Sequence, residues 1–141
     1  MRPSVKNLLL TLLVAAVFSG CMSGGSSSSS TYTITGTASD GYLQQAIVCL
    51  DFNANSLCDE GEPNSLTDEE GNYSLVLTKE QQKSLANIIA YDGIDSDTGM
   101  PFDGILQAPN DGSSIHITPI TTIVTKMVDL DISDLSNEEH G

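Results

Sequence analysis

Residues 49–63 read CLDFNANSLCDEGEP, a stretch that carries oxygen-bearing side chains at regular intervals. When Asp51 is position 1 of a twelve-residue window, Asn53, Asn55, Asp59 and Glu62 stand at positions 3, 5, 9 and 12. Ca²⁺ is a large, hard cation that takes about six to eight oxygen ligands. A short loop supplies them when alternate side chains point inward and a long carboxylate closes the shell. Residues 51–62 therefore predict a calcium-binding loop.

The spacing is that of an EF-hand loop, in which position 7, here Leu57, contributes its backbone carbonyl. Position 6 departs from this pattern, because Ser56 stands where a glycine would make the sharp turn. Two of the first three ligands are asparagines, which lowers the negative charge of the site and its expected affinity. A second interpretation stays open, since Asn and Asp side chains that bond their own backbone also form plain surface turns.

Two cysteines, Cys49 and Cys58, bracket the first three of these ligands. In an exported protein such a pair is expected to form a disulfide. Closing a loop of this size stabilises a fold by about 2–3 kcal/mol, and it would also hold the ligands in place before the ion binds. The alternative is two free thiols, which would argue against export.

The first 20 residues indicate an export signal. Arg2 and Lys6 precede an apolar run over residues 8–18 that is too short to span a bilayer comfortably. The sequence Phe18-Ser-Gly-Cys21 resembles a bacterial lipobox, at which a lipoprotein precursor is diacylated on cysteine and cleaved before it. The resemblance implies that Cys21 carries the lipid and that the Ser/Gly-rich residues 21–31 form a flexible linker. The alternative is an ordinary secretory signal with a chance cysteine.

Cleavage before Cys21 would leave a strongly acidic chain. Three lysines, Lys79, Lys83 and Lys126, would then face 19 acidic residues, for a net charge of −16. Such a charge repels nucleic acid and anionic lipid head groups and favours divalent cations. We therefore expect no nucleic-acid partner and membrane contact through the lipid alone. Met22 after the cysteine implies, by resemblance to Gram-negative lipoproteins, sorting to the outer membrane.

Alternating and β-branched residues predict strands on both sides of the loop. The expected strands cover residues 31–37, 42–50, 73–77, 86–91, 104–107 and 113–117. The loop is entered from a strand and left through Pro63, so its scaffold differs from the helix pair of a true EF-hand. The expected fold class is mainly β, a small antiparallel β-sandwich over residues 32–118 with a C-terminal amphipathic helix.

The order of strand, loop, turn and strand over residues 36–77 resembles a known group of domains. It is similar to the B-type repeats of bacterial surface adhesins and to carboxypeptidase-regulatory-like, prealbumin-type β-sandwiches. The loop residues match that group's D-x-N-x-[ND]…D-x-x-E pattern, and residues 67–73, TDEEGNY, match its T-D-x-x-G-x-Y pattern. The resemblance covers about a third of the chain and implies a calcium-binding β-sandwich.

Two shorter segments carry further expectations. Asp92, Asp95 and Asp97 alternate with other residues after the strand at 86–91. They indicate a second calcium loop, a completion of the first site, or a polar turn between strands. Thr78 and Gln81 form a capping box that predicts a short helix ending near residue 85.

A second helix is expected from Thr118 as N-cap and Pro119 as first helical residue. Residues 120, 123, 124, 127 and 128 are apolar at helical spacing, so one face should pack against another surface. Residues 119–141 then comprise this amphipathic helix and an acidic tail, in which residues 136–139 form another capping box. The chain ends directly afterwards, which we interpret as a truncation or as a fragment of a longer product.

Few side chains suit catalysis, so the sequence predicts no enzyme. His116 and His140 are the two candidate general bases near neutral pH, and no motif for a nucleophile, phosphate loop or catalytic zinc appears. The abundant carboxylates leave an acidic hydrolase open. The expected function is a calcium-stabilised structural or adhesive module of an envelope lipoprotein. The alternatives are a module that binds a peptide or glycan with purely structural calcium, and a fragment of a larger surface protein. The partner would be an envelope or extracellular protein or glycan.

Overall fold

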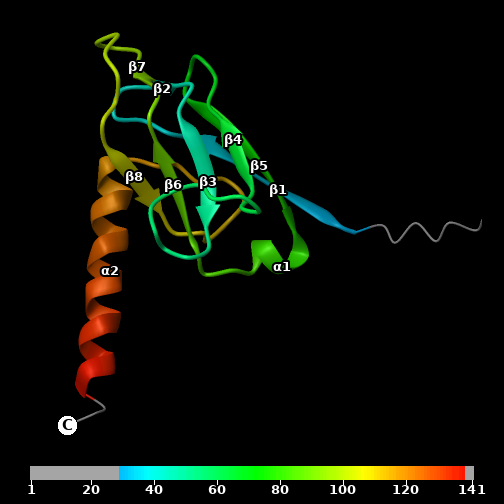
Figure 1. The fold of residues 1–141 in the computed structure, drawn as a ribbon, viewed down its shortest axis with the longest axis vertical. Helices are drawn as coiled ribbons and strands as arrows, with labels where there is room; N and C mark the ends of the chain where they lie inside the picture. Colours follow the sequence, from blue (N-terminus) through cyan, green and yellow to red (C-terminus); the bar gives the residue numbers. More distant parts are fainter. Residues whose placement is uncertain (1–28, 139–141) are drawn as a thin grey trace, which may run out of the picture.

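The computed structural model describes residues 29–138, and the side chains of residues 29–133. The expected signal, the lipidated Cys21, most of the linker and His140 lie outside the described residues. The elements in chain order are β1 (Thr31–Thr37), β2 (Leu43–Gln44), β3 (Ile47–Asp51), β4 (Asn64–Leu66), β5 (Asn72–Thr78), α1 (Lys79–Gln82), β6 (Asn87–Tyr91), β7 (Ile94–Asp95), β8 (Ile105–Ala108) and α2 (Pro119–Glu138) (Figure 1).

Two β layers enclose the core, as expected from the sequence. One layer is an antiparallel sheet in the order β4-β3-β6-β8. The other is the antiparallel pair β1–β5, alongside which residues 113–117 run parallel to β1. The fold is thus mainly β, a small sandwich followed by a C-terminal helix. A short pair, β2–β7, lies at the end of the molecule where the connecting loops gather (Figure 1).

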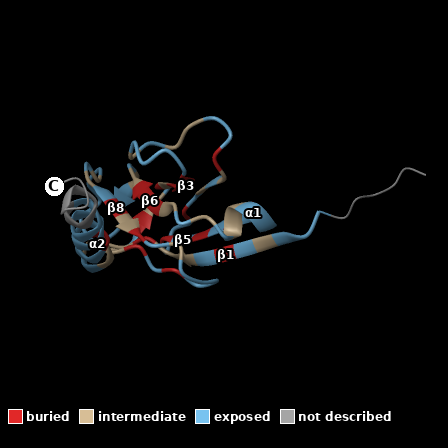
Figure 2. Ribbon diagram, turned by 90° about the horizontal axis from the view of Figure 1, so that it is seen from below, coloured by how far each residue is buried: buried red, intermediate tan, exposed pale blue. Residues whose placement is uncertain are grey.

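The alternation of side chains along the strands builds this core. In β5, Tyr73, Leu75 and Leu77 are buried while the residues between them are exposed. In the facing sheet, the β3 and β6 side chains that belong to the same core are Val48, Leu50, Ile88 and Ala90. Figure 2 shows this burial concentrated in the strands and α2 largely exposed.

The turn over residues 67–73 places β5 as its pattern predicts. Hydrogen bonds from the side chain and backbone of Asn72, and from the N–H of Glu70, hold the pKa of Asp68 below its ordinary value. At the start of β5 the hydroxyl of Tyr73 donates to the carbonyl of Ile115 at 2.6 Å. Burial raises the pKa of this phenol. This hydrogen bond therefore links β5 to residues 113–117, which run along the other side of β1.

The prediction of one continuous strand over residues 42–50 is wrong. The segment forms two strands, β2 and β3, which are separated at Gln45, whose φ is +57°. The hydroxyl of Thr67 donates to the carbonyl of Leu43 and accepts from the N–H of Ala46, so one buried side chain holds both ends of the break. This contact joins residues far apart in the sequence, and the alternation pattern cannot report it.

Two other boundaries also differ. Residues 113–117 form hydrogen bonds with β1 through isolated bridges, without the ladder of a full strand. Helix α1 has the predicted capping box at Thr78 but ends at Gln82, three residues early.

Helix α2 begins at Pro119 as predicted, and Thr118 and Thr121 cap it reciprocally. It packs along the free edge of β8. There the N–H of Gln107 donates to the hydroxyl of Thr122 at 2.8 Å, and the hydroxyl of Thr121 donates to the Gln107 carbonyl at 2.8 Å. The helix therefore covers backbone groups that would otherwise leave an open sheet edge.

The apolar face of this helix does not pack against the other described residues. The buried side chains of α2 are Thr122 and Thr125, and the predicted apolar face is exposed. The helix also continues to Glu138, so residues 136–138 extend it instead of starting a new one. Among the described residues, no helix has the length and apolarity needed to cross a bilayer.

Candidate metal centre

The predicted loop connects β3 to β4 and folds back over one face of the four-stranded sheet (Figure 1). Cys49 and Ile89 are register partners on β3 and β6, and both are fully buried although neither belongs to the main core. The loop is fastened to this face by the N–H of Cys58, which donates to the hydroxyl of Tyr91 at 3.2 Å. The loop thus has a β scaffold, as the sequence predicted.

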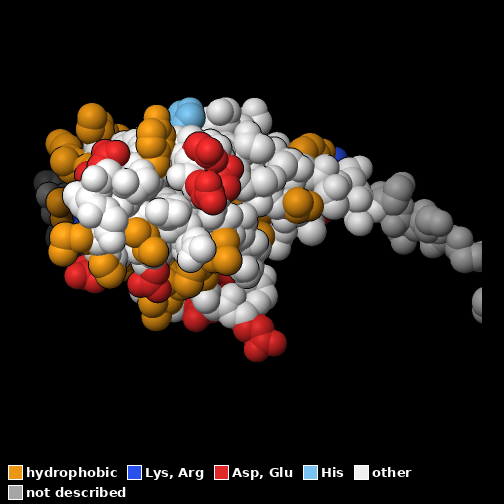
Figure 3. Space-filling view, turned by 90° about the horizontal axis from the view of Figure 1, so that it is seen from above, with side chains coloured by type: hydrophobic (Ala, Val, Ile, Leu, Met, Phe, Trp, Pro, Cys, Tyr) orange, Lys and Arg blue, Asp and Glu red, His pale blue; other side chains and the backbone are white. Residues whose placement is uncertain are grey.

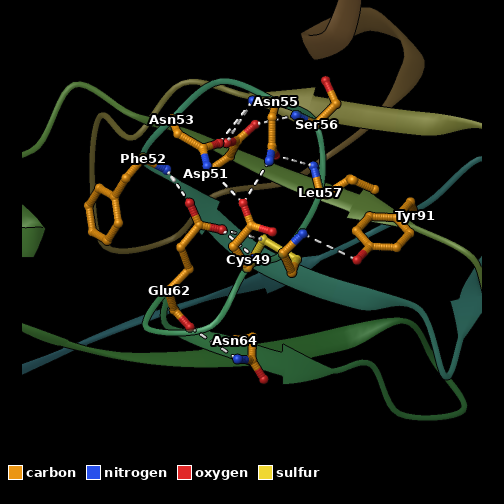
Figure 4. Close-up of a disulfide and its surroundings, with 12 residues drawn as sticks. Cys49, Asp51, Phe52, Asn53, Asn55, Ser56, Leu57, Glu62, Asn64 and Tyr91 are labelled. Atoms are coloured by element: carbon orange, nitrogen blue, oxygen red, sulfur yellow. Dashed lines mark hydrogen bonds between the residues drawn. A yellow bond between two sulfur atoms is a disulfide. The ribbon is translucent and has the colours of Figure 1, made fainter.

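The predicted disulfide between Cys49 and Cys58 is present, with 5.7 Å between the two Cα atoms. It joins a buried position of β3 to the middle of the loop, and it encloses Asp51, Asn53 and Asn55 (Figure 4). Because both sulfurs are in the bridge, neither is a thiolate ligand for a soft metal. The centre offers oxygen donors alone.

The first and last predicted ligands are the two buried carboxylates of the loop. Asp51 is 4% exposed, and its two oxygens accept from the N–H groups of Asn55 and Ser56. Glu62 is 7% exposed and accepts from the N–H of Phe52 at 2.7 Å and from that of Asp59 at 2.9 Å. These hydrogen bonds fix the carboxylate of Asp51 at the start of the loop and that of Glu62 at its end (Figure 4).

The three middle positions are linked to one another. The amide nitrogens of Asn53 and Asn55 both donate to one oxygen of Asp59, at 2.7 and 2.6 Å. The amide oxygens of the two asparagines accept from the N–H groups of Asn55 and Leu57. All five side chains named from the spacing therefore belong to one hydrogen-bonded loop. The side chain of Leu57 is exposed, which agrees with a ligand role for its backbone alone.

The sharp turn that a glycine was expected to make is made by other residues. Ser56 has a φ of +64° and Ala54 a φ of +56°. A side chain in this left-handed region costs about 1–2 kcal/mol compared with the ordinary helical region. The loop therefore retains the required turn and carries the strain of doing so without glycine.

We expect the variant Ser56→Gly to stabilise the folded chain by up to about 1 kcal/mol, because glycine adopts the left-handed region without strain. Its melting temperature should rise by a few degrees in a thermal scan. Glu60→Gly serves as the control, since Glu60 is an exposed loop residue without a positive φ, so glycine there brings only the entropic cost of ordering the chain. A Ser56→Gly variant that melts no higher than the parent would contradict the account of the turn.

The chemistry of this donor set suits a hard cation. The predicted ligands supply three carboxylates, two amide oxygens and the backbone carbonyl of Leu57, and residues 51–62 contain no lysine or arginine. Within the described residues, no three His, Cys, Asp or Glu side chains are grouped closely enough to hold a metal. The carboxylate of Asp59 instead accepts from the amide N–H groups of the two asparagines. An ion bound by this set would require both amides to present their oxygens in place of these N–H groups.

The second predicted loop uses its carboxylates differently. The two oxygens of Asp95 accept from the N–H of Asp97 and from the hydroxyl of Thr98, and these bonds lower the pKa of Asp95. The side chains of Asp95 and Asp97 also lie against Gly41. Asp95 therefore stabilises its own turn and the contact with the 38–42 turn, which agrees with the polar-turn interpretation.

A cavity of about 460 Å³, which the sequence did not indicate, opens beside the loop of residues 51–62. It is lined by loop residues Asp51, Phe52 and Ser56, by Leu85 and Asn87 beyond α1, and by Asp129 of α2. These segments are far apart in the chain, so no local sequence pattern predicts that they line one cavity.

Comparison with protein-family models and with curated proteins found no match for this chain.

Proposed function

We propose that the chain is an envelope-anchored lipoprotein whose β-sandwich is stabilised by calcium and serves as a structural or adhesive module. The observation that carries the calcium part is the single hydrogen-bonded loop that joins Asp51, Asn53, Asn55, Asp59 and Glu62. Buried carboxylates are costly in a fold unless their charge is compensated. A divalent cation would compensate the two buried carboxylates of the loop, Asp51 and Glu62, at once.

The disulfide supports the same proposal. It fixes the first half of the loop to β3, so less chain must be ordered when an ion binds. The lipobox-like sequence at residues 18–21 and the resemblance of residues 36–77 to adhesin and prealbumin-type domains support the surface location and the module type. Calcium would then act on stability, by linking β3, the loop and β4.

We expect calcium at about 10 mM to raise the melting temperature of the purified protein by about 5 °C or more. Extracellular modules bind calcium with dissociation constants of about 0.1–1 mM, and such binding stabilises the folded state by about 1.4–2.7 kcal/mol at this concentration. Differential scanning calorimetry with and without a chelator measures the shift, and a calorimetric titration measures the heat of binding.

The variant Glu62→Gln should lose most of this shift, because it removes a carboxylate of the site while keeping the shape and one hydrogen-bond acceptor. Glu69→Gln is the matched control, since Glu69 is an exposed carboxylate in the turn outside the loop. If the parent protein shows neither heat nor a melting shift with calcium, the calcium proposal is wrong. Equal shifts in both variants would place the ion elsewhere.

Mass spectrometry of the protein isolated from its native envelope tests the anchoring. We expect a chain that begins at Cys21, with the added mass of a diacylglycerol group and the two-hydrogen deficit of a disulfide. A chain with an unmodified Cys21 would refute the lipid anchor and leave the calcium proposal unaffected.

The cavity beside the loop favours one alternative, a module that binds a small ligand or a peptide side chain while calcium only stabilises it. Phe52 and Leu85 would supply apolar contacts there, and Asn87 a hydrogen-bond group. Binding to glycan and envelope-protein arrays that persists in the variant Asn87→Leu would exclude the cavity as the binding site.

A further inference from the structure

The exposed side of α2 carries a continuous apolar face. Its side chains are between 50% and 74% exposed, and they are Ile120, Ile123, Val124, Met127, Val128 and Leu130. Their spacing of three and four residues places them on one side of the helix over about 15 Å. Isolated exposed aliphatic residues are ordinary, but a contiguous row of this kind marks an interaction surface.

The exposure of this face follows from how the helix is attached. The opposite side of α2, formed by Thr118, Thr121, Thr122 and Thr125, is the side that contacts the sandwich. Its hydroxyl groups bond to the β8 edge and to the helix carbonyls, so this side is already committed. The helix therefore cannot bury its apolar face on the sandwich by rotating without breaking those bonds.

The apolar face continues into a hollow beside the helix. A cavity of about 370 Å³ lies between α2, the end of β8 and the 113–117 segment. Its lining includes Ala108, Pro109, Ile115, Ile120 and Val124. An apolar face next to a hollow of this size suits a second helix, which can lie along the face and insert one large apolar side chain.

Acidic side chains stand at both ends of this surface. Asp111 lines the hollow near Ile120, and Asp131 follows Val124 by seven residues and Met127 by four, on the same face. Figure 3, which looks onto one end of the molecule, shows several patches of acidic side chains and hardly any basic ones. The chain from Cys21 onward has three lysines against 19 acidic residues. A cationic occupant is attracted to this surface, whereas a second copy or an anionic lipid surface is repelled.

We infer that the apolar face of α2 and the adjoining hollow dock an amphipathic helix of another protein, with apolar residues on one side and lysines or arginines flanking them. Its apolar side covers the row from Ile120 to Leu130. Its basic residues lie near Asp111 and Asp131. This assigns a partner chemistry to a surface that the metal loop does not use, so the inference is independent of calcium.

The test uses the purified full chain and a synthetic peptide of about 18 residues, with leucines at helical spacing on one side and lysines on the other. Two control peptides have the same composition in scrambled order, or glutamate in place of lysine. Fluorescence anisotropy should show the amphipathic basic peptide binding about tenfold more tightly than either control. Raising the salt concentration should weaken it, because the charge contribution is screened.

The double variant Ile123→Ser/Met127→Ser should bind the peptide about tenfold less tightly, because it removes apolar area at the centre of the face. Both side chains are more than half exposed, so the fold is not expected to change. The matched control is Val76→Ser on β5, where the valine is 60% exposed on the other sheet. That variant should bind the peptide as the parent does.

Four results would overturn the inference. Equal affinity for the amphipathic and scrambled peptides, or no effect of the double variant, would mean that the face is not the docking surface. Sedimentation showing a dimer that Ile123→Ser/Met127→Ser dissociates would make a second copy the occupant. Binding to phosphatidylcholine vesicles that exceeds binding to the peptide would make it a lipid surface.

Discussion

The variant Gly36→Ala is expected to lose about 3 kcal/mol or more of its stability, enough to unfold much of a marginally stable domain. Gly36 lies on β1 opposite Tyr73 of β5. A Cβ atom added there would lie 1.7 Å from the carbonyl oxygen of Ile115 and 3.0 Å from the Tyr73 hydroxyl. No side-chain rotation relieves the first overlap, because the oxygen belongs to the backbone.

The size of this effect follows from what meets at Gly36. The carbonyl of Ile115 accepts the hydroxyl of Tyr73 at 2.6 Å, so an added methyl separates β1, β5 and the 113–117 segment at a single point. Because Tyr73 and Ile115 are both core residues, the displacement reaches the packed interior.

Urea unfolding and thermal scans measure this loss, with the melting temperature expected to fall by more than about 12 °C. Gly112→Ala is the control, since a Cβ there meets nothing within 4 Å and Gly112 does not have a positive φ. A Gly36→Ala variant that is as stable as the Gly112→Ala variant would show that the 113–117 segment does not approach β1 as described.

The second large effect is expected from removing the disulfide. The double variant Cys49→Ala/Cys58→Ala should lose about 2.5 kcal/mol of stability, because the unfolded chain regains the freedom that a bridge across this short loop removes. The loss grows further if the buried Cys49 position is left with a small void. The melting temperature should fall by about 10 °C or more.

Two measurements separate the roles of the bridge. The parent protein in a reducing agent should melt as the double variant does, and the double variant should be insensitive to the reducing agent. If the bridge also orders the metal loop, the variant will need a higher calcium concentration for the same melting shift. Identical melting of oxidised and reduced parent protein would contradict a stabilising role for the bridge.

The sequence anticipated the local features well, since each depends on residues close together in the chain. The alternation over residues 31–37 and 73–77 appears in β1 and β5, and the capping residues Thr78 and Thr118 open α1 and α2. The loop side chains named from their spacing lie in one hydrogen-bonded loop, and the cysteine pair is bridged. Whether that loop holds calcium stays a prediction.

The features that sequence reasoning missed depend on distant contacts. The hydroxyl of Thr67 bonds the backbone of Leu43 and Ala46 on the two sides of the strand break at Gln45. The backbone N–H of Gln107 donates to the hydroxyl of Thr122 on α2. The turn at Ser56 adopts a backbone conformation for which its residue type gives no signal. Asp129 reaches the cavity beside the metal loop from the far end of the chain.

The sequence by itself determined strands β1, β5, β6 and β8, the loop spacing, the bridge and the helix with one apolar side. Hydrophobic periodicity and turn residues involve only a few neighbouring positions, so they can be recognised in the sequence alone. Only the tertiary structure decided that α2 turns its threonines inward and its aliphatic side chains outward. The physical reason is that the threonine hydroxyls bond the backbone of Gln107 at the open edge of β8, and this contact joins segments that the helical pattern cannot relate to one another.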